Sequence, residues 1–305
     1  MGQRASLAVI TKHGAELYYS HWTAGSLDRT LFWGPAYATG FIRQHESEAE
    51  GAKILDDAWA EGGAVVDHTR RRLLWFGGDD VLWNVALRRV HLALMGRLWQ
   101  DWTIEWAHEG IADIADALGI SRDVVLTFKG RKPPDPRSVF ERRPDDRSWK
   151  RTILSSERNG ELQLWVTHPD IKEVLSAGLP LLGSLADARG VAALDYAEIS
   201  EDPEEVPTGG LHVDWDRQEL SFWHAHDRPG LESRVRAWFP GWHVVWWRDR
   251  FEAQAEAAGG LLLFPAPETD MLLARVRQIL LDDPRTRSKE RRRMLLDRAI
   301  ADVFG

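Results

Sequence analysis

The chain has 305 residues, 44% of them hydrophobic and 28% charged, with a net charge of −8 at pH 7 and no cysteine. The lack of cysteine excludes disulfides, thiolate catalysis and cysteine-based zinc sites, and the negative charge disfavours generic nucleic-acid binding, which needs a positive field facing the phosphates. No apolar run reaches the roughly 18 residues of a membrane span, so we expect a cytoplasmic protein that does not bind a membrane.

The first half of the chain predicts alternating hairpins and helices. Residues 6–22 predict a hairpin that turns at Lys12-His13-Gly14, because glycine supplies a turn residue with positive φ. Residues 26–45 predict a helix that Gly34-Pro35 kinks or splits. A hairpin, a helix, a strand, a helix and a closing strand are then expected at 63–76, 80–99, 102–107, 110–118 and 124–128.

The second half predicts the same order of elements. Asn159-Gly160 is the strongest hairpin signal in the chain and places a turn within a hairpin over 151–167. Helical segments, a hairpin, a helix, a strand, a helix and a strand follow at 170–188, 211–223, 230–238, 242–248, 249–258 and 260–264. Two further helices, at 268–282 and 286–304, have no counterpart in the first half.

Matching sequence blocks indicate that one unit occurs twice. Residues 62–76 match residues 209–223 without a gap, and residues 102–119 match residues 242–259. The matched pairs are Gly62/Gly209, Gly63/Gly210, Val66/Val213, Asp67/Asp214, Arg70/Arg217 and Leu73/Leu220, then Trp102/Trp242, Trp106/Trp246, Ala115/Ala255, Ala117/Ala257 and Gly119/Gly259. Gly62-Gly63, Gly77-Gly78 and Gly209-Gly210 lie beside hairpin strands, and we interpret them as turn residues.

These patterns predict a mixed α/β protein of the α+β class, with two similar ββα-ββ-α-β-α-β halves related by a pseudo-two-fold axis. The closing β-α-β of each half is expected to be a right-handed crossover between parallel strands. The expected domains are a first repeat (1–128), a linker rich in proline and charge (129–150), a second repeat (151–265) and a helical C-terminal extension (266–305).

The 16 tryptophans divide into repeated and non-repeated positions. Trp102 and Trp106 share one face of a predicted strand, as Trp242 and Trp246 do, and we interpret these four as core residues. Tryptophans outside the repeat are better candidates for a surface role, such as stacking on a sugar, a base or a cation. These residues are Trp22, Trp33, Trp59, Trp83, Trp149 and Trp247.

A possible metal site follows the second hairpin of the second half. If the strand continues, His224 and His226 share one face and can bind a divalent metal, with Asp227 as a third ligand or an orienting group. The matching segment of the first half, residues 77–80, lacks both histidines. Helix N-capping is the simpler explanation for Asp227, and no further spaced ligands complete a zinc motif.

A second candidate site lies where a predicted strand meets a helix. His108 and Glu109 follow the strand, at the edge of the sheet where open α/β folds bind ligands, and can form an acid/base pair. Their counterparts are Arg248 and Asp249, a pair suited to an anion or a salt bridge. The simpler explanation is that acidic side chains favour the positive ends of helices.

The C-terminal helix is basic in an otherwise acidic chain. From Arg285 to Gly305 there are seven basic and three acidic residues, and Leu296, Ile300 and Phe304 form an apolar stripe. The stripe predicts a docked helix. The opposite face, which carries Arg291, Arg292 and Arg293, is either solvated or binds an acidic protein, another subunit or RNA.

No phosphate loop, dinucleotide fingerprint, nucleophile elbow or zinc-protease helix is present in the sequence. The leading hypothesis is therefore a cytoplasmic, non-catalytic protein that binds another protein or a second copy of itself, in a bacterial defence, toxin-neutralising or regulatory system. One alternative is a metal-assisted hydrolase or nuclease with the His/Asp site in one half, and a divalent metal is then the expected cofactor. The other is a small-molecule sensor that binds between the halves.

Overall fold

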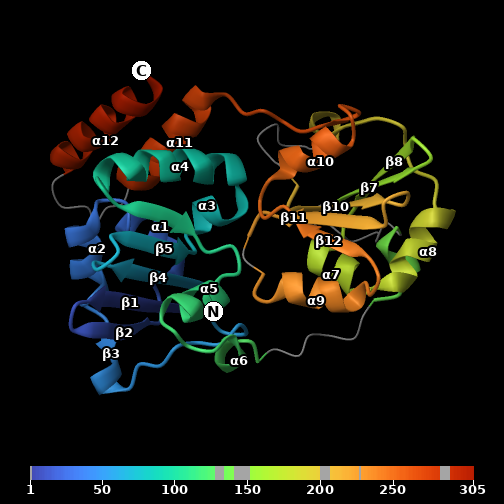
Figure 1. Cartoon of the computed structure of the whole chain (residues 1–305). Helices are drawn as coiled ribbons and strands as arrows, with labels where there is room; N and C mark the ends of the chain where they lie inside the picture. Colours follow the sequence, from blue (N-terminus) through green and yellow to red (C-terminus); the bar gives the residue numbers. More distant parts are fainter. Residues whose placement is uncertain (1, 128–133, 141–151, 200–206, 227, 282–288) are drawn as a thin grey trace. The chain divides into compact units, whose positions relative to one another are not determined.

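The computed structural model of the chain describes residues 2–127, 134–140, 152–199, 207–226, 228–281 and 289–305 (Figure 1). The protein is of mixed α and β class, as predicted, and divides into two compact units. Unit 1 comprises Met1–Phe128 and Pro267–Gly305, and unit 2 comprises Lys129–Ala266. The chain therefore leaves unit 1, builds unit 2 and returns to unit 1 for its last two helices.

Unit 1 is built on a six-stranded mixed sheet with the order β3-β2-β1-β4-β5-β6. Its strands are β1 (Ala5–Thr11), β2 (Gly14–Ser20), β3 (Glu46–Ser47), β4 (Gly62–Asp67), β5 (Arg72–Phe76) and β6 (Thr103–Trp106). β1 runs parallel to β4 and β5 runs parallel to β6, whereas the other neighbours are antiparallel. β4 is buried along its whole length, which explains its run of small and β-branched residues.

The helices of unit 1 include the two at the C-terminus of the chain. They are α1 (Leu27–Thr30), α2 (Pro35–Ile42), α3 (Asp79–Trp83), α4 (Val85–Leu98), α5 (Ile111–Ala117), α6 (Arg122–Val125), α11 (Thr269–Leu281) and α12 (Lys289–Phe304). Short 3-10 turns cover Ala24–Ser26 and Glu48–Glu50. Both α11 and α12 pack on α4 (Figure 1). Val276, Leu280 and Leu296 join the same hydrophobic core as the strands of the sheet.

Unit 2 is built on a five-stranded mixed sheet with the order β12-β11-β10-β7-β8. Its strands are β7 (Thr152–Arg158), β8 (Glu161–Thr167), β10 (Gly209–Asp214), β11 (Glu219–His224) and β12 (His243–Trp246). Its helices are α7 (Ile171–Ser176), α8 (Leu179–Asp187), α9 (Leu231–Trp238) and α10 (Phe251–Ala257), with 3-10 turns at Pro136–Val139 and Tyr196–Glu198. Leu211 and Val213 of β10 share one core with α7, α8 and α9, and α10 packs on the opposite face against Gly210.

The two sheets share strand order, strand direction and register. In unit 1 the order β2-β1-β4-β5-β6 matches β8-β7-β10-β11-β12 of unit 2, with the parallel and antiparallel neighbours at the same places. Leu73 lies opposite Ile104 as Leu220 lies opposite Val244, and these four residues occupy matched positions of the sequence blocks. Descent from a duplicated unit and a pseudo-two-fold axis remain predictions.

Three elements differ from their sequence-based expectation. The helix expected over 80–99 is interrupted at Asn84, whose backbone is extended and whose side chain caps α4 by accepting a hydrogen bond from the backbone N–H of Leu87. The strand expected over 124–128 is wrong, because the hydroxyl of Ser121 caps a short helix, α6, by accepting a hydrogen bond from the backbone N–H of Asp123. In unit 2 the expected strand over 260–264 shrinks to β13 (Leu262–Leu263), which pairs with β9 (Leu194–Asp195) in a separate two-stranded sheet. Neither closing crossover therefore joins strands of the main sheets.

The glycine pairs Gly62-Gly63 and Gly209-Gly210 lie inside β4 and β10 and are not turn residues. A Cβ atom on Gly210 would lie 2.0 Å from Gln254 Oε1, so the bare glycine lets α10 pack directly on β10. Gln254 accepts a hydrogen bond from Trp223 Nε1 at 2.7 Å and donates to the carbonyl of Leu211 at 3.0 Å. At the matched place in unit 1, Ile114 of α5 packs on Gly63. The same close approach is polar in unit 2 and apolar in unit 1.

Part of the expected linker over 129–150 lies outside the described residues, as do residues 200–206, Trp149 and Asp227. Residues 134–140 of the linker are described, and Val139 joins a core cluster of unit 2. This segment therefore belongs to a packed unit.

The C-terminal helices predict a measurable stability contrast within unit 1. Leu280 is 1% exposed on α11, so Leu280→Ala is expected to destabilise the protein by about 2–5 kcal/mol, through lost burial and the cavity left behind. Met294 on α12 is 69% exposed, and Met294→Ala should stay within about 0.5 kcal/mol of the parent. Urea unfolding followed by tryptophan fluorescence measures both. Equal stability of the two variants would contradict the docking of α11.

Candidate functional site

The two histidines proposed as metal ligands lie in the interior of unit 2. His224, at the end of β11, is 1% exposed, and His226 is 4% exposed. The ring of His224 stacks on Trp246 at 5.4 Å, and its Nδ1 donates to the backbone carbonyl of His226. Within the described ranges, which omit Asp227, no group of three or more His, Asp or Glu side chains is placed to hold a metal ion.

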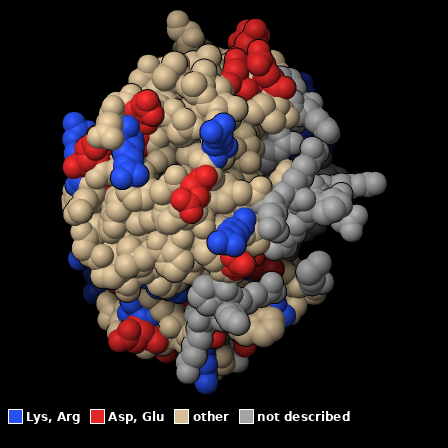
Figure 2. Space-filling model, turned by 90° about the vertical axis from the view of Figure 1, so that its right-hand side faces the viewer, with Lys and Arg blue, Asp and Glu red and all other residues tan. Residues whose placement is uncertain are grey.

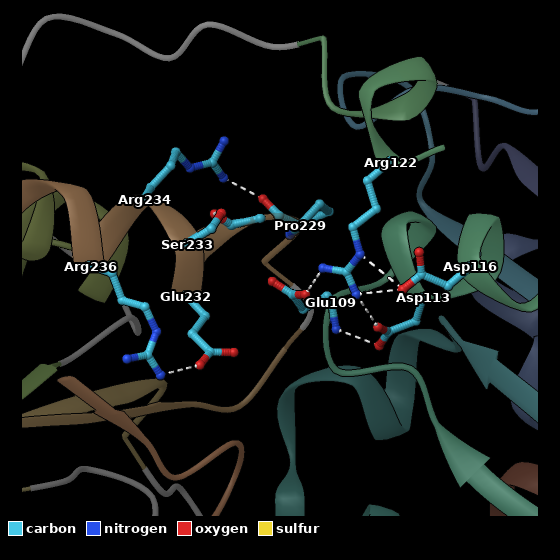
Figure 3. Close-up of polar contacts among 10 residues, drawn as sticks. Glu109, Asp113, Asp116, Arg122, Pro229, Glu232, Ser233, Arg234 and Arg236 are labelled. Atoms are coloured by element: carbon cyan, nitrogen blue, oxygen red, sulfur yellow. Dashed lines mark hydrogen bonds and ion pairs between the residues drawn. The ribbon is translucent and has the colours of Figure 1, made fainter. Parts of the chain in front are cut away.

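Glu109 forms an ion cluster with a residue that has no local sequence signal. Arg122, at the start of α6, pairs with Glu109, Asp113 and Asp116 (Figure 3). Its Nε donates to Asp116 at 2.9 Å and its Nη2 donates to Asp113 at 3.2 Å. These bonds raise the pKa of the Arg122 guanidinium. The structure thus gives Glu109 a cation as its partner, and His108 beside it is half-buried.

Arg248 contributes its backbone to the fold. It adopts φ of +59°, and its carbonyl accepts a hydrogen bond from the backbone N–H of His224 at 2.9 Å. Its side chain is exposed. Arg248 therefore anchors the end of β11 through its backbone, and anion binding by its side chain stays a prediction.

The Arg122 cluster predicts a stability effect that a simple surface pair lacks. Arg122→Ala leaves three neighbouring carboxylates without their shared cation, and we expect a loss of about 1–2 kcal/mol after allowance for the partial exposure of Arg122. Arg236, which pairs with Glu232 one helical turn away, provides the control (Figure 3). Arg236→Ala should cost about 0.3–0.5 kcal/mol. Thermal unfolding at low and high salt distinguishes the two variants. Equal losses of stability would contradict a special role for the Arg122 cluster.

A buried titratable pair lies beside the sheet of unit 1. Asp28 of α1 is fully buried, and burial raises the pKa of its carboxyl from 3.8 to about 7, against a smaller opposing effect of Arg29. His91 of α4 donates its Nε2–H to the backbone carbonyl of Asp28 at 3.0 Å, and burial lowers the pKa of its imidazole to about 4. At neutral pH the fold therefore favours an uncharged His91 and resists ionisation of Asp28.

The pH dependence of stability follows from these directions. The favourable contribution of neutral Asp28 is fully present below about pH 4 and is lost as the pH rises through 7, because the unfolded carboxyl ionises first. Asp28→Asn cannot ionise, so its stability relative to the parent should rise between pH 4 and 8, by at most about 4 kcal/mol. Denaturant midpoints across this range measure the effect. Asp101→Asn, at a side chain that is 83% exposed, should give a curve parallel to the parent. A parallel curve for Asp28→Asn would refute the buried-acid account.

An open groove of about 450 Å³ lies in unit 1 along α12. The start of α2, the end of α4 and the exposed flank of α12 form its walls. Its lining is Trp33, Pro35, Arg97, Leu98, Gln100, Leu295, Arg298, Ala299 and Asp302. The groove thus combines apolar side chains with two arginines, a glutamine and one aspartate.

One of the three predicted arginines of α12 has a packing role. The guanidinium of Arg292 lies over the rings of Trp33 and Tyr37, at 4.7 and 5.1 Å, and donates a hydrogen bond to the Tyr37 hydroxyl at 2.8 Å. Arg292 therefore fixes α12 against α2 and shapes the groove beside Trp33. Arg291 and Arg293 are exposed.

The cations around the groove are open to a ligand. In the part of the chain that the structure describes, Arg298 has no ion-pair partner, and Arg97 donates to the backbone carbonyl of Asp302 at 2.9 Å. Asp297, the nearest acidic neighbour of Arg298 in sequence, pairs with Arg277 at 3.2 Å. Met294 and Leu295 add exposed apolar surface. The sequence singled out Arg291, Arg292 and Arg293, whereas the arginines that line the groove are Arg97 and Arg298. Trp33 was predicted to have a surface role, but nothing in the sequence placed it beside α12.

A second apolar surface, on unit 2, has a different character. Figure 2 faces α8 and β8 and shows mainly uncharged side chains. Leu179, Val191 and Leu263 are between 41% and 52% exposed, but they are spread over separate segments. Scattered apolar residues of this kind are ordinary on protein surfaces. The groove of unit 1 is the better candidate, because it joins apolar and cationic groups in one concave site.

Comparison with known proteins found no matching family model, no similar curated protein and no similar solved structure. None of the helices in the described ranges is long and apolar enough to cross a membrane. Function is therefore inferred from the chemistry of the side chains.

Proposed function

We propose that this protein acts by binding another protein, as a non-catalytic regulatory or neutralising component of a bacterial system, and that the groove along α12 holds an acidic segment of the partner. The observation that carries the proposal is that apolar side chains of the groove lie beside Arg97 and Arg298, neither of which has a carboxylate partner among the described residues. The apolar side chains, the local charge and the size of the groove also favour an acidic peptide.

The groove chemistry favours an acidic peptide with apolar side chains. Trp33, Leu98 and Leu295 supply surface that gains free energy when a hydrophobic side chain covers it. Arginine binds carboxylates in two-pronged geometry and is weakly hydrated, so it tolerates desolvation in an interface better than lysine. An acidic segment with one or two apolar anchors satisfies both groups at once.

Electrostatics also favours binding of an acidic partner at the α12 region. The chain carries a net charge of −8, so most of its surface repels an acidic protein, whereas the α12 region attracts it. Such a local reversal of sign steers association and fixes register more than it adds affinity. The size of the groove suits a short segment, because pockets of about 300–1,000 Å³ hold a few side chains and not a folded domain.

Photo-cross-linking tests the proposal directly. A benzophenone amino acid at Leu295, 40% exposed at the groove, should cross-link in the native host to a partner protein through a segment rich in Asp and Glu. Adding Arg298→Glu should reduce the adduct at least about tenfold, because a buried like-charge contact costs more than 1.4 kcal/mol. Peptide mapping by mass spectrometry identifies the segment.

Two controls make the result specific. The same cross-linker at Leu263, 51% exposed on unit 2, should not yield this adduct. Arg217→Glu, on a hairpin tip with an 81% exposed side chain, should leave the Leu295 adduct unchanged. Identical adducts from both positions, or an adduct that survives Arg298→Glu, would count against the groove.

A further inference from the structure

Two tryptophans of unit 1 are exposed to an extent that packing does not explain. Trp22 is 66% exposed and Trp59 is 55% exposed. A tryptophan side chain offers a large apolar area, and leaving it in water forgoes the free energy that burial would contribute. Both belong to the non-repeated tryptophans of the sequence, so neither is a core position inherited by both units.

Adjacent backbone segments bring the two residues to the start of β1. The backbone N–H of Gln3 donates to the carbonyl of His21 at 2.9 Å, which places Trp22 on one side of the strand. The backbone N–H of Glu61 donates to the carbonyl of Arg4 at 2.9 Å, which places the segment of Trp59 on the other. The side chain of Arg4 lies between these segments.

We term four neighbouring side chains the aromatic row: Trp22, His21, Arg4 and Trp59. The rings of Trp22 and His21 lie 4.5 Å apart, and the guanidinium carbon of Arg4 lies 4.6 Å from the centre of the Trp59 ring. A Cβ atom on Gly2 would lie 2.9 Å from the ring of His21 and 3.4 Å from the Arg4 guanidinium. The glycine at position 2 thus leaves room for His21 and Arg4 to approach each other.

Arg4 differs in its hydrogen bonding from Arg88, which stacks on Trp106, and from Arg292. Arg88 donates to the backbone carbonyl of Leu82 at 3.0 Å, and Arg292 donates to the hydroxyl of Tyr37. Within the described ranges the guanidinium of Arg4 has no hydrogen-bond or ion-pair partner, and the nearby carboxylate of Glu61 accepts the backbone N–H of Arg4 instead. Stacking on Trp59 holds the guanidinium in place while its N–H donors stay available to an anion.

We propose that the aromatic row binds a nucleotide unit, with a base stacked on an exposed tryptophan and a phosphate at Arg4 and His21. Stacked aromatic side chains beside a cation are the usual platform for single-stranded nucleic acid. A neutral sugar would use the aromatic faces but not the open guanidinium. The unit can come from a free nucleotide or from a single strand, and both present the same base and phosphate.

The net charge of the protein limits the mode of binding. With a charge of −8 elsewhere repelling a polyanion, affinity must come from stacking and from only one or two phosphate contacts. The logarithm of the association constant should then fall with the logarithm of salt concentration with a slope of only about −0.7 to −1.4. This site is separate from the groove along α12, which uses none of its residues.

Fluorescence anisotropy with the full chain tests the proposal. The probe is a fluorescein-labelled oligouridine of about ten nucleotides, with unlabelled adenosine monophosphate as competitor. Trp22→Ala and Trp59→Ala should each weaken binding by about tenfold, the size of one base–aromatic stack, whereas Trp22→Phe should retain most of the affinity. Arg4→Gln should weaken binding and reduce the salt slope by about 0.7.

The controls separate the row from other exposed groups and from the proposed protein-binding function. Tyr37→Ala, at an exposed aromatic side chain, and Arg298→Glu, in the groove, should leave oligouridine binding unchanged. Displacement of the probe by the mononucleotide at similar concentration identifies a nucleotide site, and displacement only by longer strands identifies a single-strand site. Absence of binding up to about 1 mM, or binding that survives both tryptophan-to-alanine changes, would overturn the proposal.

Discussion

The parallel pairing of two hairpins is the constraint on which each unit depends. β1 lies beside β4 in unit 1 and β7 lies beside β10 in unit 2, so the central strands are buried on both faces and need helical cover on both sides. Gly63 and Gly210 let one helix pack directly on the sheet. In unit 1 the cover extends to α4, on which the chain's last two helices pack. The α12 groove forms where the C-terminal helices return to the first unit and pack on α4.

Buried polarity distinguishes units that share a topology. Unit 2 buries a hydrogen-bonded group in which Gln254 binds Trp223 Nε1, Ser155 and two backbone carbonyls, and His212 binds the hydroxyl of Ser155. Unit 1 has Ile114 at the place of Gln254, and it buries the titratable side chains of Asp28 on α1 and His91 on α4. Between about pH 4 and 6.5 the effects of Asp28 and His91 on the slope of stability oppose each other, since one resists ionisation and the other resists protonation.

The role of each arginine depends on what it touches, and the sequence gives no sign of that. Arg122 forms ion pairs with three carboxylates, and Arg292 fixes α12 by stacking on two aromatic rings. Arg298 and Arg4 keep their donors available, one beside an apolar groove and the other on an exposed tryptophan. Arginines that pair with carboxylates stabilise the fold. Arginines whose N–H donors have no carboxylate partner can bind an anion. This contrast underlies both proposed binding sites, and both lie in unit 1.

The sequence by itself determined the local elements: the hairpin at Asn159-Gly160, the split of the helix at Gly34-Pro35, the α+β class and the burial of Trp106. Turn chemistry and side-chain periodicity act within a few residues, so they can be read in order along the chain. The tertiary structure alone decided that α11 and α12 belong to unit 1, that His224 and His226 are interior, and that Glu109 meets Arg122. It also overruled the β-branched residues at 124–125 in favour of a capped helix. These outcomes depend on which distant segments meet in space, and no local pattern encodes that encounter.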